Sequence, residues 1–236
     1  PRSAIRRMCP VPALGMMGAW RRLGCHGDMP EIAVPYATNR ADGVRIAYTV
    51  EGDGPPLVLL HGSASSADLW HGLGYVEALK DRYRLILPDA RGHGRSEKPH
   101  EEDAYAMPLL VGDVVAVLDA LDLEEAHFLG YSLGGRVGFG IGRYAPERFA
   151  SLAVGGGSYR TAPGFLDRVA YAGALDTMAT RGIEGFLAQW ERRLGVPIPP
   201  AVRLAYLAND VQALVPYFRR SDREPSVEEA LPSMAM

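Results

Sequence analysis

The chain has 236 residues, of which 47% are hydrophobic and 22% are charged, and its formal net charge is −3. This length supports one sizeable core, or a core with a small insertion, and the apolar fraction excludes a disordered chain. The weak acidic balance gives no reason to expect a nucleic-acid partner, and two cysteines exclude both a disulfide scaffold and a four-cysteine zinc site.

Residues 1–28 differ from the rest of the chain in charge, because they hold five arginines against the single acid Asp28. Pro10 and Pro12 interrupt their apolar stretch, so a secretory signal fits poorly. An organellar targeting peptide fits somewhat better. The favoured interpretation is a leader that is disordered or not native, with the true start at Met29, because fold signals begin only after that residue.

From residue 44 onward the chain alternates between strand and helix patterns. The strand patterns lie at residues 44–50, 57–60, 84–87, 126–130 and 151–154, and the helical patterns lie at residues 67–79, 107–121 and 133–144. Asp113 and Asp122 are expected on the surface of the second helix. Since parallel strands need crossover connections, this order predicts an α/β fold, with a mostly parallel sheet flanked by helices.

After residue 157 the alternation ends. Helical patterns follow at residues 165–178, 183–194 and 201–217, and a short helix is expected at 226–231. An all-helical insertion in an α/β chain predicts a cap over the carboxyl ends of the strands, where ligands bind. The expected division is a leader at 1–28, a core at 29–156, a helical cap at 157–224 and a return to the core at 225–236.

The strongest motif is GYSLGG at residues 130–135, between an apolar strand pattern and a helix of small residues. This is the context that a G-x-S-x-G nucleophile turn requires. Ser132 would occupy a strained turn that exposes its hydroxyl, and the backbone N–H of Leu133 would point at a developing oxyanion. The alternative, a glycine-rich turn with a helix-capping serine, is less favoured in this context.

A second motif, HGS at residues 61–63, follows a buried strand pattern. Gly62 allows the loop to curl beside the nucleophile, and the N–H of Ser63 can supply a second oxyanion donor. His61 is expected to bond to the loop backbone as a structural residue, in preference to a role as catalytic base.

The third motif is DARGHGRS at residues 89–96. Its glycines, paired charges and terminal serine predict a tightly hydrogen-bonded structural loop built on Asp89, Arg91, Gly92, His93 and Ser96. A phosphate-binding loop is excluded, because the Lys and Ser/Thr pair of such loops is missing. His93 is expected to be structural as well.

In this order the three motifs resemble those of the α/β-hydrolase superfamily, in its lidded AB hydrolase-1 group with a serine nucleophile. The resemblance covers about residues 40–236 and implies Ser132 as the nucleophile, with the N–H groups of Ser63 and Leu133 as the oxyanion hole. The group includes carboxylesterases, lactonases of the 3-oxoadipate enol-lactonase type, thioesterases, cofactor-free haloperoxidases and carbon–carbon bond hydrolases. No cofactor and no metal is expected.

The remaining members of a catalytic triad are not found in the expected order. The family places an acid and then a histidine after the serine, but all six histidines precede Ser132. The aspartates that follow it (Asp167, Asp176, Asp210 and Asp222) fall in or beside cap helices. We therefore expect a C-terminally truncated fragment that lacks about fifty residues, including the triad Asp and His, and that is itself nearly inactive.

The predicted function is hydrolysis of a carboxylic ester, lactone or thioester through an acyl-enzyme, with carbon–carbon bond hydrolysis or haloperoxidase-like chemistry as the alternative. A non-catalytic binding module, a pseudoenzyme on the same scaffold, is the alternative of another class. Tyr131, Phe186 and Trp190 are candidate substrate-binding residues, although such residues at helical spacing are also typical of lid packing. We expect a small acyl substrate, no nucleic acid, no membrane span and a cytoplasmic location, and leave the oligomeric state open.

Overall fold

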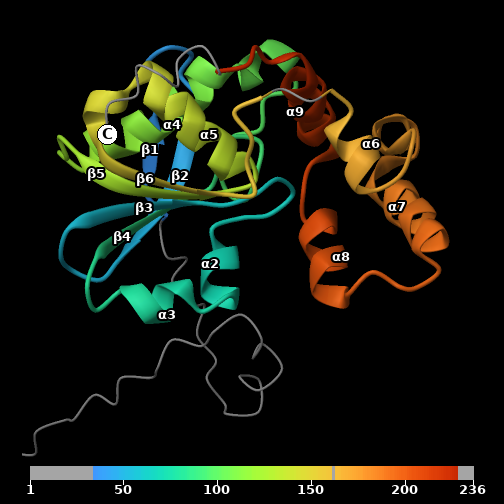
Figure 1. Ribbon diagram of the computed structural model, residues 1–236, viewed down its shortest axis with the longest axis horizontal. Coiled ribbons are helices and arrows are strands. Elements are labelled where there is room, and N and C mark those ends of the chain that lie inside the picture. The colour runs from blue at the N-terminus through green and yellow to red at the C-terminus, as the bar shows by residue number, and fades with distance from the viewer. Residues whose placement is uncertain (1–33, 161–162, 228–236) are drawn as a thin grey trace, which may run out of the picture. The chain divides into compact units, whose positions relative to one another are not determined.

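The computed structural model describes residues 34–160 and 163–227, and these form a mostly parallel sheet with helices on both faces (Figure 1). The strands are β1 (Tyr36–Thr38), β2 (Arg45–Glu51), β3 (Pro56–Leu60), β4 (Arg84–Pro88), β5 (Ala126–Tyr131) and β6 (Phe149–Gly155). Their order in the sheet is β1-β2-β4-β3-β5-β6. β3, β4, β5 and β6 run parallel, whereas β2 pairs antiparallel with both β1 and β4.

The five strands predicted from the sequence are confirmed to within two residues at each end. β1 has no counterpart in the prediction, because three residues are too few to establish an alternating pattern. The central strand β3 is apolar throughout because both of its faces are buried. Val58 and Leu60 belong to the larger hydrophobic cluster, while Leu57 and Leu59 belong to a second cluster with Trp70.

Two long helices cover one face of the sheet, α4 (Met107–Ala120) and α5 (Leu133–Tyr144), and both were predicted. Figure 1 shows them on the side of the sheet opposite to α2 (Asp68–Gly72) and α3 (Tyr75–Leu79). A single helix was predicted over residues 67–79, but Gly74 interrupts it with a φ of 77°. Short 3-10 turns, η2 (Glu102–Tyr105) and η3 (Pro146–Arg148), precede α4 and β6.

A run of helices follows β6, as the sequence predicted, but the single helices expected at 165–178 and 201–217 are each divided in two. It consists of α6 (Phe165–Val169), α7 (Ala174–Leu194), α8 (Pro200–Leu207) and α9 (Val211–Arg223), which we call the helical segment. α9 begins at Asp210, whose carboxylate accepts the N–H of Gln212 at 2.8 Å. The helix expected at 226–231 does not begin at Ser226 or Val227, and its remaining positions lie outside the described residues.

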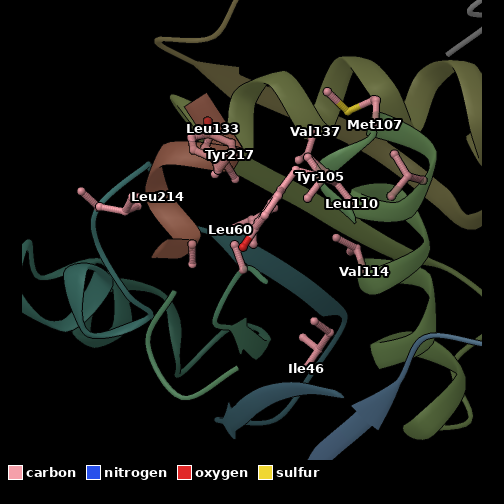
Figure 2. Packing of buried hydrophobic residues seen from close by; sticks show 14 of the residues in the cluster. Ile46, Leu60, Tyr105, Met107, Leu110, Val114, Leu133, Val137, Leu214 and Tyr217 are labelled. Carbon is pink, nitrogen blue, oxygen red and sulfur yellow. The ribbon is translucent and has the colours of Figure 1, made fainter. Parts of the chain in front are cut away.

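α9 packs against the segment that connects β4 to α4. Its Tyr217 ring packs edge-on against Tyr105 and His93, with centroids 5.9 and 5.7 Å apart. Figure 2 shows Tyr217 and Leu214 of α9 in the same buried cluster as Leu133 of α5. None of the helices in the described part of the chain is long and apolar enough to cross a bilayer.

Candidate active site at the turn between β5 and α5

Ser132 occupies a strained turn between β5 and α5, as the motif predicted. Its φ is 54° and its ψ is −107°, a conformation that side chains with a Cβ rarely adopt. The Ser132 N–H donates to the carbonyl of Gly155 at 2.8 Å, which ties the turn to the end of β6. The Ser132 hydroxyl has no hydrogen-bond partner among the residues that the structure describes. The turn therefore presents an unbonded hydroxyl.

Two glycines allow this turn to form. A Cβ on Gly130 would lie 2.2 Å from the carbonyl oxygen of Gly134, and a Cβ on Gly134 would lie 2.1 Å from that of Leu60. Both contacts are with backbone, which cannot rotate away as a side chain can. The glycines of the motif thus bring α5 close to β5 and to the end of β3.

The loop at residues 61–63 lies directly beside the serine. The N–H of Gly134 donates to the carbonyl of His61 at 3.1 Å, and a Cβ on Gly62 would lie 3.2 Å from the Cβ of Ser132. The backbone N–H groups of Ser63 and Leu133 donate no hydrogen bond within the described residues. Two amide donors and one hydroxyl are therefore available at the same place.

His61 is fully buried and bonded to the loop backbone on both sides of its ring. Its Nδ1 donates to the carbonyl of Gly62 at 2.7 Å, and its Nε2 accepts the N–H of Ala90 at 3.0 Å. These two bonds require a neutral ring with the proton on Nδ1. Burial lowers the pKa of His61, which favours the same state. The ring thus makes the structural contacts that the sequence predicted.

Residues 89–96 form a tightly bonded loop at the end of β4. The Asp89 carboxylate accepts the N–H groups of Ala67 and Arg95, both at 2.8 Å. Ser96 donates its hydroxyl to the carbonyl of Asp89 at 2.6 Å and accepts the N–H of Ala47 at 2.9 Å. The loop thereby joins β2, β4 and the start of α2.

Arg91 is the charged centre of this loop and is fully buried. Its guanidinium donates to Asp113 at 2.6 and 2.5 Å and to Asp42 at 2.6 Å. Burial disfavours the charge of Arg91, but the bonds to Asp113 and Asp42 outweigh it and raise the pKa of Arg91. The prediction of Asp113 on the surface of α4 is wrong. Its side chain is buried because the pairing with Arg91 compensates for its desolvation.

His93 belongs to the same loop and is fully buried, with its ring against Tyr217 of α9. Its Nδ1 donates to the carbonyl of Arg91 at 2.9 Å, and its Nε2 has no partner among the described residues. Burial, with a smaller contribution from the neighbouring His61, lowers the pKa of His93 to about 3. Gly92 precedes it with a φ of 78°, the left-handed conformation that favours glycine.

A cavity of about 140 Å³ opens at the serine, and we call it the Ser132 cavity. The sheet side contributes Ser63, Ser132, Leu133, Arg136, residues 156–158 and Arg160, and the helical segment contributes Phe165, Arg168, Tyr217 and Ser221. The hydroxyls of Ser63 and Tyr217 lie 3.2 Å apart, so α9 contacts the loop that carries one of the two amide donors.

The predicted substrate-binding residues lie apart from this lining. Phe186 is fully buried within the helical segment, where its ring packs against Tyr171, Trp190 and Tyr206. Phe186 and Trp190 therefore join α7 to its neighbours, as lid packing would require. Tyr131 is half-exposed and lines a separate groove with residues of α2 and β6.

Most of this lining was not predicted from the sequence, including residues 156–158, Arg160 and Arg168, and three further residues, Arg136, Tyr217 and Ser221. The position of Arg136 in the sequence could have indicated its place in the cavity, because it lies one helical turn after Ser132. In the structure its N–H donates to the carbonyl of Ser132 at 2.9 Å. No sequence pattern places Tyr217 and Ser221 near Ser132, since they reach the cavity from α9, far along the chain.

The fold is that of a known family. A family model for the alpha/beta hydrolase fold matches residues 55–198, and this chain belongs to that family. A hydrolase from Pseudomonas aeruginosa PA01 has a similar structure, with a TM-score of 0.66 and 29% sequence identity over 83% of this chain and 74% of its own.

Two relatives carry more specific descriptions. The pimeloyl-acyl-carrier protein methyl ester esterase of Aeromonas hydrophila is 44% identical over 101 residues, which cover 43% of this chain and 37% of that protein. The 3-oxoadipate enol-lactonase 1 of Acinetobacter baylyi is 34% identical over 128 residues, which cover 53% of this chain and 46% of that protein. The chain spans about half the length of the curated relatives that it matches.

Proposed function

We propose that the whole protein is a serine hydrolase that cleaves a carboxylic ester, lactone or thioester through an acyl-enzyme on Ser132. One observation carries the proposal: an unbonded hydroxyl in a strained turn lies beside the N–H groups of Ser63 and Leu133, which have no acceptor in the described part of the chain. Such strain costs energy and clusters at functional sites. The esterase and the lactonase among the relatives support this reaction class.

The proposed reaction has two steps. The Ser132 hydroxyl loses its proton to a base and attacks the substrate carbonyl carbon, and the carbonyl oxygen becomes an oxyanion held by the amides of Ser63 and Leu133. The tetrahedral intermediate collapses and the bond to the alcohol or thiol breaks, so that this leaving group takes up the proton; it departs from an ester or thioester, and stays attached to the acyl group when a lactone opens. Water then attacks the acyl-enzyme, releases the carboxylic acid and restores the serine.

We propose that a histidine, oriented by an acid, serves as the base and completes the site in the whole protein. This proposal is supported by the position of all six histidines before Ser132 in the sequence, and by the bonds of the nearby His61 and His93 rings to loop backbone.

We also propose that residues 157–224 act as a cap. The helical segment supplies one side of the Ser132 cavity, and Tyr217 contacts the loop at residues 61–63. A cap of this kind excludes water from the acyl-enzyme until the leaving group has departed.

The experiment that tests the function compares Ser132→Ala with Ser151→Ala in the whole protein. Hydrolysis of a short p-nitrophenyl ester is expected to fall by about 10⁴-fold or more in Ser132→Ala. Ser151 lies exposed on β6 outside the cavity lining, with its hydroxyl bonded to His127, so Ser151→Ala is expected to keep its activity. Equal turnover in Ser132→Ala would refute the nucleophile. A wild-type protein that a fluorophosphonate does not label at Ser132 would instead indicate a binding module.

A further inference from the structure

The charged side chains that line the Ser132 cavity are arginines. Among the described residues its lining includes Arg136, Arg160 and Arg168, and no aspartate or glutamate. They come from three parts of the chain: α5, the loop after β6, and α6. A positively charged side chain in the wall of a cavity raises the local concentration of anionic ligands there.

Of the three arginines, Arg136 is the one closest to Ser132 along the chain, one helical turn after it. Its guanidinium is half-buried and donates to the hydroxyl of Ser221 and, at 3.2 Å, to the Ser221 carbonyl. Both partners are neutral, and no carboxylate pairs with Arg136 within the described residues. Its charge is therefore compensated by no acid there, in contrast to that of Arg91, which two aspartates neutralise.

Two acids at the C-terminal end of α9 are engaged elsewhere. Asp222 accepts the N–H of Phe165 at 3.3 Å, and Glu224 pairs with Arg220 at 2.7 Å. Neither lines the Ser132 cavity, although Glu224 borders the small neighbouring cavity that Arg136 also lines. The two bonds to Ser221 hold the Arg136 side chain in place, so a ligand meets a guanidinium that is already positioned.

We propose that the acyl group taken by this site carries a second, ionised carboxylate, and that Arg136 binds it. This inference rests on the proposed function, since it names the substrate class of the same site. A guanidinium presents paired N–H donors that match the two oxygens of a carboxylate. The cavity of about 140 Å³ limits the group to a short chain, because sites for larger ligands exceed about 300 Å³. The substrate is a half-ester, half-thioester or lactone of a short dicarboxylic acid.

The test uses two fluorophosphonates with short tails of equal length, one ending in a carboxylate and the other in a carboxamide. The second-order rate constant for labelling of Ser132 is measured for each by intact mass in the whole protein. We expect the carboxylate probe to react about tenfold faster at low salt, and the ratio to shrink as salt is added. In Arg136→Gln the ratio is expected to fall to near one, and Arg136→Lys is expected to keep part of it.

Arg143→Gln is the matched control. Arg143 lies on the same helix, stacks on Tyr144 and is absent from the cavity lining, so its loss should leave the ratio unchanged. Equal rates for the two probes in the wild type, or an Arg136→Gln variant that slows both probes alike, would overturn the carboxylate site while leaving Ser132 as the nucleophile. Failure of both probes to label Ser132 would overturn the proposed function and this inference together.

Discussion

At the scale of the residue, the turn at Ser132 was predictable because its requirements are local. The glycines at 130 and 134 have no space for a Cβ, and the serine adopts a positive φ that the spacing of the motif implies. The partners of the site were not predictable in this way. Arg136 could have been found from its position one turn after the serine, but Tyr217 meets Ser63 only through the packing of α9.

The strain at Ser132 predicts an unusual order of stability among its variants. Because glycine adopts positive φ without steric cost, Ser132→Gly is expected to exceed Ser132→Ala in free energy of unfolding by about 1 kcal/mol. Chemical denaturation measures this difference. At Ser151 in strand β6, an ordinary extended position, the order should reverse, with glycine the less stable. A Ser132→Gly variant less stable than Ser132→Ala would contradict the prediction.

At the scale of the element, strands buried on both faces were the easiest to predict, since β3 and β4 are apolar at nearly every position. The ends of helices were predicted less accurately than those of strands. For example, Gly74 divides one expected helix into α2 and α3. The amphipathic pattern of α4 identified Asp113 as polar and therefore as exposed. It contained no information about Arg91, which comes from a distant loop and compensates the buried carboxylate.

This pairing predicts a large difference between two aspartates of α4. Asp113→Ala leaves the buried Arg91 with only Asp42 as its acidic partner, and is expected to lower the free energy of unfolding by about 3 kcal/mol. Asp119 pairs with Arg148 at 2.7 Å on the partly exposed side of the same helix, so Asp119→Ala should cost at most about 1 kcal/mol. Urea denaturation compares the two. Similar losses would show that burial of the Arg91 pair contributes little.

At the scale of the whole molecule, the α/β architecture followed from the alternation of patterns, and the helical segment followed from its interruption. The set of residues that lines the Ser132 cavity could not be predicted in this way. These residues come from the ends of β3 and β5 and from α6 and α9, which lie far apart in the sequence. Contacts such as the hydrogen bond between His100 and Asp210, 2.9 Å apart, join the core to α9 and leave no pattern in the sequence. Packing over such distances along the chain is fixed only by the complete fold.

Two buried histidines predict how stability depends on pH. The folded state keeps His93 neutral down to about pH 3, and burial also lowers the pKa of His61, whereas both titrate near 6.5 when unfolded. Below that value the unfolded state binds more protons, so the free energy of unfolding falls as the pH is lowered. Each histidine contributes up to about 1.4 kcal/mol per pH unit.

Urea denaturation between pH 7 and about pH 5, above the range where most carboxylates titrate, measures this slope. A free energy of unfolding that stays constant across this interval would contradict the buried, neutral state of His61 and His93.

The positive φ of Ser132 also has a consequence for laboratory evolution. The residue that the proposed chemistry needs is one that the backbone tolerates poorly, so heat resistance and catalysis place opposite demands on this position. A randomised library selected only for survival at high temperature should therefore accumulate glycine at position 132. A library selected for turnover should retain serine there and recover its stability at other sites.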